Sequence, residues 1–192
     1  MAFHVLLASP DTDMLRRSLL LLAAAVLGAT TLERLDVDQM VQRSSAVVQA
    51  RVLDGRSYWR GRTIYTNYRL QISKTIKGYV PATTEVSVPG GTIGDLRQHI
   101  PGAPKLTIGQ EYVIFLWKGP SGTTHLLGLS QGLFNMEIGA DGTVRLSRSP
   151  VEAVEFVDAQ GRETQDRGVT LTLADLERRV SAWKSKAQEA QR

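Results

Sequence analysis

Residues 63–72 read Thr-Ile-Tyr-Thr-Asn-Tyr-Arg-Leu-Gln-Ile, and this stretch decides the fold class. Its even-numbered positions, from Ile64 to Ile72, alternate with the side chains between them in the period of a half-buried strand. Residues 46–52 alternate in the same way, and Arg60-Gly61 lies between the two runs. The pattern predicts a long β-hairpin.

Further strands are predicted after the hairpin. Residues 84–88 form a short third strand, which ends at Pro89-Gly90-Gly91. Residues 89–110 are rich in glycine and proline and predict a long loop, with room for a short strand near Ile93. Residues 111–117 are apolar on both faces, so we expect the central strand of the sheet there.

The second half of the chain continues as a β-meander. A turn at residues 119–122 precedes a returning strand at 125–129, and residues 134–138 are predicted to pair with 143–146 across Asp141-Gly142. Ser149 to Glu152 is similar to the start of a helix, whereas residues 154–157 followed by a turn are typical of a strand. The β-branched side chains favour the strand.

Two helices complete the pattern. Asp36 can cap a short helix near the start of the barrel, and Thr172 can cap a C-terminal helix at about residues 173–187. The predicted fold class is mainly β: a small antiparallel barrel, open or closed, like the oligonucleotide/oligosaccharide-binding (OB) barrel, with a short N-terminal helix and a C-terminal helix. We assign residues 30–150 to the β-barrel domain and residues 151–192 to a C-terminal extension.

Residues 1–29 have the composition of a secretory signal peptide. Arg16 and Arg17 form a basic segment, and the apolar run from Leu19 to Ala29 is shorter than the roughly 20 residues that a membrane-spanning helix needs. Acidic residues before Met14 do not suit a basic segment, so we place the true start at Met14. We expect export by the general secretory route to the periplasm or the extracellular space, with no stable membrane span in the mature chain.

The chain contains no cysteine. Disulfides, thiolate catalysis, cysteine-ligated zinc and a lipid anchor on an N-terminal cysteine are therefore excluded. The formal net charge is +4 at pH 7, a mild excess that favours an anionic partner. We expect a monomer that is stabilised by its apolar core.

Gly128-Leu129-Ser130-Gln131-Gly132 matches the G-x-S-x-G nucleophile elbow of serine hydrolases. That elbow joins a strand to a helix in a large α/β sheet, and its histidine follows the serine in the chain. Here His99 and His125 both precede Ser130. We therefore interpret the motif as a turn at a strand end and keep a hydrolase based on Ser130 as an alternative.

Metal and acid/base chemistry find little support in the sequence. His99 and His125 have no neighbour at ligand spacing, and Asp141-Gly142 alone does not make a calcium loop. Glu152 and Glu155 are the obvious carboxylate pair for a glycosidase, but Glu155 equally fits a solvent-facing strand position. We predict no metal, no cofactor and no catalytic residue.

The hairpin carries the most informative cluster. Between Gly55 and Thr84 the sequence has no acidic residue, and basic and aromatic side chains are interleaved. Guanidinium groups bind anions and rings stack, so this surface suits single-stranded nucleic acid or an acidic polysaccharide, although a solvated hairpin has a similar composition. The predicted partner-binding residues are Arg56, Tyr58, Trp59, Arg60, Arg62, Tyr65 and Arg69.

Six segments of the chain form a familiar pattern when taken together: residues 46–52, 76–78, 88–91, 101–104, 106–116 and 128–132. They resemble a family of uncharacterised exported bacterial proteins. The order of a strand, an Ile-Lys-Gly after the second strand, and a Gly-Gln-Glu-Tyr-Val-Ile-Phe-Leu strand is also similar to the barrel in the N-terminal domain of tissue inhibitors of metalloproteinases. The resemblance covers roughly residues 40–135.

The resemblance implies an OB-like barrel but not the inhibitory mechanism. Those inhibitors grip the protease zinc through an N-terminal Cys-x-Cys ridge, and this chain has no cysteine. Similar exported proteins occur together with secreted matrixin-like proteases, and the resemblance therefore implies a protease-associated partner.

These observations lead to one expectation and two alternatives. We expect a non-catalytic exported binding module for a protein or an anionic glycan, because export argues against nucleic acid. The expected contact surface is the basic hairpin from Arg56 to Arg69 together with the long loop from Pro89 to Gly109. The alternatives are a secreted hydrolase, based on Ser130 or on carboxylates, and a structural envelope component.

Overall fold

The computed structural model describes residues 31–151 and 154–190. The predicted signal peptide at residues 1–29 and the proposed start at Met14 lie outside the described residues, as does Glu152 of the carboxylate pair. Among the residues described, no helix is both long and apolar enough to cross a membrane.

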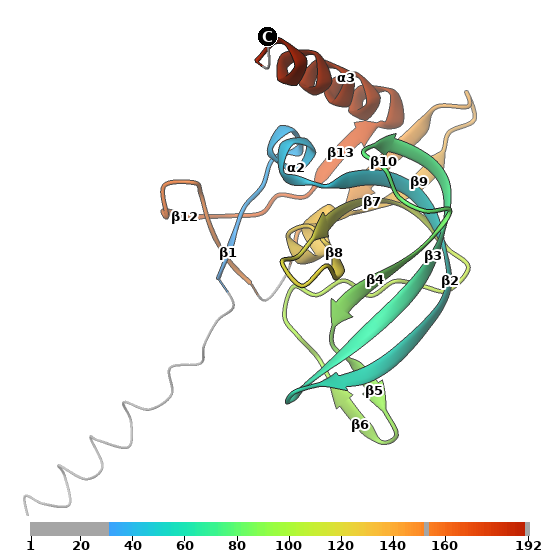
Figure 1. The fold of residues 1–192 in the computed structure, drawn as a ribbon. Coiled ribbons are helices and arrows are strands. Elements are labelled where there is room, and N and C mark those ends of the chain that lie inside the picture. Colours follow the sequence, from blue (N-terminus) through green and yellow to red (C-terminus); the bar gives the residue numbers. More distant parts are fainter. Residues whose placement is uncertain (1–30, 152–153, 191–192) are drawn as a thin grey trace, which may run out of the picture.

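The chain folds into an open antiparallel barrel, which confirms the predicted OB-like fold class (Figure 1). The main sheet has the strand order β13-β10-β9-β7-β2-β3-β4, and β8 pairs with β7. The strands are β1 (Thr31–Glu33), β2 (Ala46–Arg60), β3 (Thr63–Lys77), β4 (Thr83–Pro89), β5 (Gly91–Ile93), β6 (Leu96–Gln98), β7 (Glu111–Lys118), β8 (Thr124–Leu126), β9 (Leu133–Ile138), β10 (Val144–Arg148), β11 (Glu155–Val157), β12 (Glu163–Thr164) and β13 (Val169–Thr172). The helices are α2 (Val37–Arg43), the short 3₁₀ helix η2 (Leu129–Gly132) and α3 (Leu173–Glu189).

The long hairpin of β2 and β3 is the main structural element of the barrel. Its two strands stay paired from Val47 and Lys77 to Arg60 and Thr63. Three register shifts, the last between Val52 and Asp54, interrupt the ladder. Such bulges bend and twist a strand, so they let the sheet curl around its own inner face.

Each face of the central strand β7 packs on its own core. Ile114 and Leu116 pack inside the barrel with Val48 of β2. Phe115 lies on the other face, in a cluster that includes Leu176 of α3. The prediction of a central strand covered on both sides is therefore confirmed.

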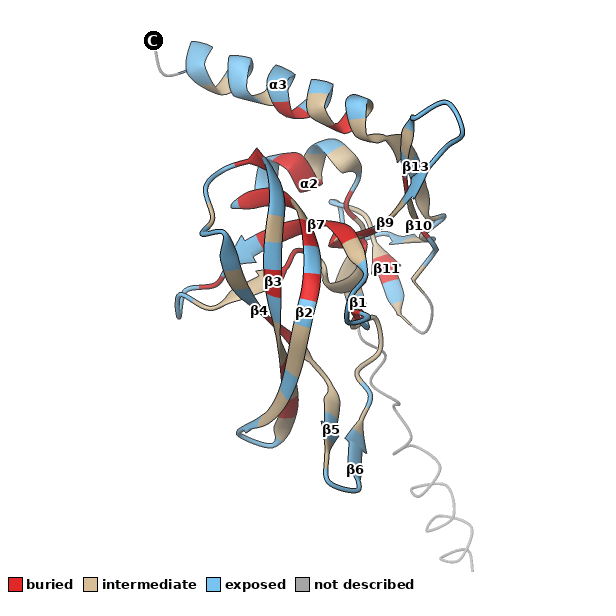
Figure 2. Cartoon of the chain, turned by 90° about the vertical axis from the view of Figure 1, so that its right-hand side faces the viewer, coloured by how far each residue is buried: buried red, intermediate tan, exposed pale blue. Residues whose placement is uncertain are grey.

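The caps of both helices form as predicted from the sequence. The Asp36 side chain accepts a hydrogen bond from the Gln39 amide at the start of α2, and the Thr172 side chain accepts one from Asp175 at the start of α3. Figure 2 shows the buried residues concentrated near these helices, whereas the far end of the β2–β3 hairpin is mostly exposed or partly exposed. The hairpin end is thus the part of the barrel with the least demand for packing.

The barrel stays open along one seam, between the edge strand β4 and the short strand β8. A side-chain hydrogen bond crosses it: His125 Nδ1 donates to the carbonyl oxygen of Ser87 at 3.0 Å. The roles are set by chemistry, because a carbonyl oxygen can only accept. The predicted return strand at residues 125–129 is shorter than expected, since β8 ends at Leu126 and η2 begins at Leu129.

Residues beyond 150 add to the sheet rather than only covering it. β13 pairs with β10, and β11 pairs in parallel with β1 and antiparallel with β12. The strand favoured at residues 154–157 is present as β11. A buried ion pair between Arg148 and Asp166 ties the segment to β10.

Candidate binding surface

Five of the seven predicted site residues share one face of the β2–β3 hairpin. In the ladder Arg56 lies opposite Asn67 and Tyr58 lies opposite Tyr65, so alternate residues of the two strands project to the same side. We call this surface the hairpin face, and it comprises Arg56, Tyr58, Arg60, Tyr65 and Arg69.

The other two predicted residues lie elsewhere on the hairpin. Trp59 is opposite Ile64 and projects to the other side, where it is 50% exposed. Arg62 follows Gly61, which turns the chain with a φ of 63°. The structure therefore places Arg62 at the tip and Trp59 behind it, next to the hairpin face but not in it.

The rings of the hairpin face contact one another and a cation. The centroids of Tyr58 and Tyr65 are 6.2 Å apart, and the Arg60 guanidinium carbon lies 5.6 Å from the Tyr65 centroid. The Tyr58 hydroxyl lies 3.0 Å from Ser87 Oγ, which fixes the ring on β4. The rings are thus held in place before any partner arrives.

The charges of the hairpin face differ in how they are compensated. Arg69 pairs with Asp54 and lies opposite Glu85 in the β3–β4 ladder. Within residues 31–151 and 154–190, no carboxylate pairs with Arg56, Arg60 or Arg62. Positive charge is therefore concentrated toward the tip of the hairpin.

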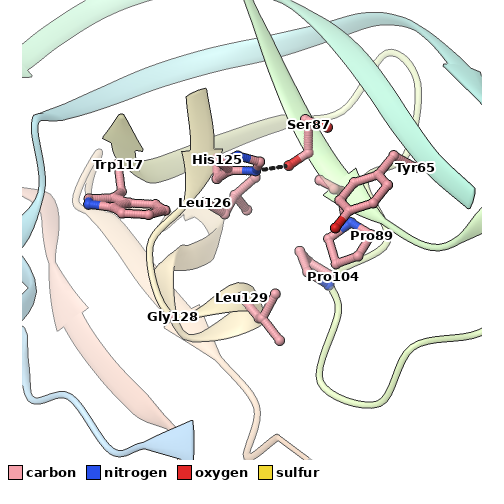
Figure 3. Close-up of a pocket in the computed structure, with 10 residues that line it drawn as sticks. Tyr65, Ser87, Pro89, Pro104, Trp117, His125, Leu126, Gly128 and Leu129 are labelled. Carbon is pink, nitrogen blue, oxygen red and sulfur yellow. Dashed lines mark hydrogen bonds between the residues drawn. The ribbon is translucent and has the colours of Figure 1, made fainter. Parts of the chain in front are cut away.

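An apolar pocket of about 310 Å³ opens at the seam of the barrel. Figure 3 shows Trp117 and Tyr65 on opposite sides of this pocket, with His125 and its bond to Ser87 between them. The Trp117 and His125 rings are tilted by 34° with centroids 5.9 Å apart. We call this cavity the seam pocket, and Tyr65 joins it to the hairpin face.

The 3₁₀ helix η2 builds the lower wall of the seam pocket. Gly128 and Leu129 both have left-handed φ values, 61° and 58°. Leu129 is the one residue other than glycine with a positive φ among those the structure describes. A leucine in this conformation is strained, and such strain is typically found next to functional sites.

A second, polar cavity of about 600 Å³ adjoins the seam pocket. Hydroxyl side chains of Ser57, Thr66 and Tyr68 line its floor, and Arg97 and Lys105 line its rim. Burial raises the pKa of the Tyr68 phenol above its usual 10.0, so the ring is neutral near pH 7. We call this cavity the basic cavity.

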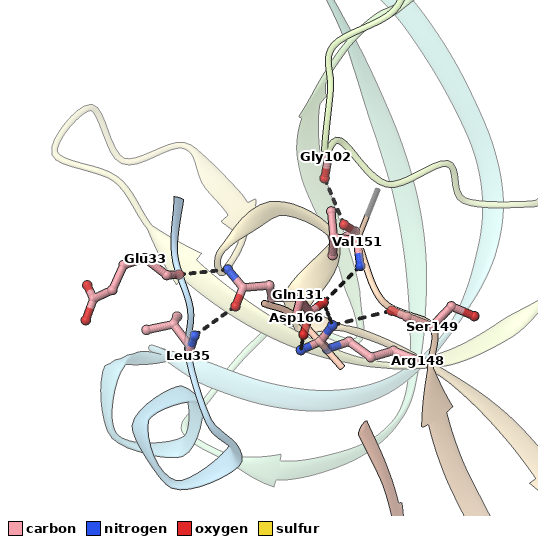
Figure 4. Close-up of polar contacts among 9 residues, drawn as sticks. Glu33, Leu35, Gly102, Gln131, Arg148, Ser149, Val151 and Asp166 are labelled. Carbon is pink, nitrogen blue, oxygen red and sulfur yellow. Dashed lines mark hydrogen bonds and ion pairs between the residues drawn. The ribbon is translucent and has the colours of Figure 1, made fainter. Parts of the chain in front are cut away.

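The G-x-S-x-G motif holds the fold together at η2 (Figure 4). Ser130 Oγ donates to the carbonyl of Gly102 at 2.8 Å. Gln131, which is fully buried, accepts from the Leu35 amide at 2.8 Å and donates to the Glu33 carbonyl at 3.0 Å. A side chain at Gly132 would meet the Leu127 carbonyl oxygen at 2.6 Å. Structural contacts therefore account for Ser130, Gln131 and Gly132 in this motif.

The histidines do not complete a catalytic pair with Ser130. His125 Nδ1 is bonded to Ser87, while His99 lies on the lining of the basic cavity. The described part of the chain has no group of three or more His, Asp or Glu side chains placed to hold a metal ion.

Sequence reasoning predicted part of this second region and missed the rest. Arg97, Pro104 and Lys105 lie in the long loop at residues 89–109, which was expected to form the contact surface together with the hairpin, although these three residues were not singled out. Trp117 was expected only as part of the central strand, and the folding of the seam places it with Tyr65 and Pro104 around one pocket.

Comparison of the chain with models of known protein families and with curated proteins gives no match. The class of the protein is therefore described from its fold and its surface alone: it is an open OB-like barrel with an aromatic and basic surface.

Proposed function

We propose that the protein is an exported, non-catalytic binding module whose partner is a protein or an anionic glycan. The observation that carries the proposal is the hairpin face itself. Two tyrosine rings lie beside Arg56 and Arg60, which have no carboxylate partner among the described residues, whereas Arg69 pairs with Asp54. Exposed, positively charged surfaces with aromatic anchors are typical of sites that recognise anionic partners.

A capture experiment tests this function. The protein is immobilised and incubated with secreted and periplasmic fractions, and retained proteins and polysaccharides are identified by mass spectrometry. We expect the combined variant Arg56→Ala, Arg60→Ala, Arg62→Ala to retain about fivefold less partner at low salt and to depend less on salt, because these charges steer and hold an anion. Its melting temperature should stay close to that of the wild type, because all three side chains are exposed.

A matched variant controls for the loss of net charge. Arg178→Ala, Lys184→Ala, Lys186→Ala removes three exposed cations from α3, far from the hairpin face. It should capture as much partner as the wild type. Equal capture by both triple variants would disprove a role for the hairpin face, and the absence of any soluble partner would favour a structural envelope component.

A further inference from the structure

The seam pocket and the basic cavity adjoin, and we call the two together the groove. Both are lined by Val88, Pro89 and Pro104, so they meet at the end of β4. Trp117 and Tyr65 line the seam-pocket part of the groove, and residues of β5 and β6 line its basic-cavity part. Cavities of about 310 and 600 Å³ are within the range of small-ligand sites.

The charge of the groove has one sign. No carboxylate lines either cavity, whereas Arg97 and Lys105 line the basic cavity with exposed side chains. Across the described ranges no carboxylate forms an ion pair with either cation. A concave surface lined by a single sign of charge concentrates ligands of the opposite sign.

The rings of the groove are placed to stack. Trp117 is 42% exposed, and Tyr65 is partly exposed on the opposite wall. The electron-rich face of an aromatic ring attracts the slightly positive C–H groups of a sugar ring. Hydroxyls of Ser57 and Thr66, 3.0 Å apart, lie on the floor of the neighbouring cavity.

The same seam disfavours a peptide that adds as a strand. Such a peptide needs the outward backbone groups of the edge strand β4. The Ser87 carbonyl already accepts from His125, and Pro89 has no amide hydrogen. The groove therefore favours a ligand that offers rings and anionic groups rather than a peptide backbone.

We infer that the groove binds an extended anionic polysaccharide, with sugar rings on Trp117 and Tyr65 and carboxylates on Arg97 and Lys105. This inference rests on the proposed function, because it specifies the partner of the binding module. It adds a site that lies beside the hairpin face and shares only Tyr65 with it.

Isothermal titration calorimetry of the full chain with oligogalacturonate tests the inference. We expect binding that weakens as sodium chloride rises, and no binding of cello-oligosaccharides of equal length, which carry no charge. Trp117→Ala should weaken binding about tenfold through the loss of stacking. The pair Arg97→Ala, Lys105→Ala should weaken it by a similar factor and reduce its salt dependence. Lys184→Ala, Lys186→Ala removes the same charge from α3 and should bind as the wild type does.

Melting temperatures within a few degrees of the wild type would show that the groove variants are folded. If the folded groove variants bind oligogalacturonate as tightly as the wild type, the groove is not the site. If poly-glutamate binds as tightly and loses affinity in the same variants, the ligand class is wrong. In either case the proposed function stands as long as the hairpin triple variant still loses its partner, so the two failures are distinguishable.

Discussion

Gln131 makes its contacts with the backbone of a segment almost a hundred residues away in the chain. Its side-chain amide bonds both Leu35 and Glu33, and it is fully buried between them. Neighbouring Ser130 also bonds backbone, but the Gly102 carbonyl accepts from both the Ser130 hydroxyl and the Ser130 amide. Loss of the Gln131 side chain would therefore leave backbone groups of Leu35 and Glu33 unpaired, whereas loss of the Ser130 hydroxyl would leave the Gly102 carbonyl still paired with the Ser130 amide.

Gln131→Ala should lower the free energy of unfolding by about 2–4 kcal/mol, because it leaves the buried Leu35 amide without an acceptor and opens a cavity. Ser130→Ala should cost only about 0.5–1 kcal/mol, since the Ser130 amide still satisfies Gly102. Urea unfolding of both variants measures the difference. A larger loss in Ser130→Ala than in Gln131→Ala would contradict this structural account of the motif.

At the scale of elements, Lys77 joins β3 to both helices. Its buried ammonium donates to the carbonyls of Val41 and Ser44 at the end of α2. It also lies 4.0 Å from the centroid of the Trp183 ring on α3. Burial lowers the pKa of Lys77 below its usual 10.5. Gly78 follows with a φ of 73°, and a side chain there would meet the Ser45 carbonyl oxygen at 2.3 Å.

Lys77→Met keeps the length of the side chain but leaves the carbonyls at the end of α2 without their donor. We expect it to lower the free energy of unfolding by about 2 kcal/mol. Lys74→Met is the matched control on the same strand, because Lys74 pairs with Glu177 of α3 at 2.6 Å but is half exposed. Exposed pairs contribute at most about 1 kcal/mol. The free energy of unfolding of both variants is measured by chemical denaturation. Equal losses in the two variants would show that Lys77 does not join β3 to the helices more strongly than an exposed ion pair does.

For the molecule as a whole, sequence patterns predicted the elements that depend on residues close together in the chain. Alternation identified β2 and β3, a continuous apolar run identified β7, and the cap residues Asp36 and Thr172 marked both helix starts. The seam could not be predicted, because it depends on how far the bulges of β2 curl the sheet and so on which loops meet β4. For the same reason the sequence indicated the hairpin face and the loop that carries Arg97 and Lys105, but not that Trp117 and this loop line adjoining cavities.

The buried ion pair between Arg148 and Asp166 should contribute to the acid sensitivity of the whole molecule. Asp166 and Arg148 are almost completely buried, with side-chain exposures of 1% and 3%. Burial by itself raises the pKa of Asp166, but hydrogen bonds from Arg148 and from the Val151 amide at 2.9 Å outweigh it. The net effect is a pKa below the usual 3.8.

Because the folded chain holds a proton on Asp166 less tightly than the unfolded chain does, this stabilisation is complete above about pH 4. It is lost as the pH falls through the lowered pKa. Asp166→Asn should be about 3 kcal/mol less stable than the wild type at pH 7, since Arg148 keeps its buried charge. The difference should shrink below pH 4, as wild-type Asp166 becomes protonated. Urea unfolding between pH 2 and 7 measures it, with Asp95→Asn, a change in the exposed β5–β6 turn, as a control that should be about as stable as the wild type at pH 7. A gap between wild type and Asp166→Asn that is the same at pH 3 and pH 7 would show that the carboxylate charge does not stabilise the fold.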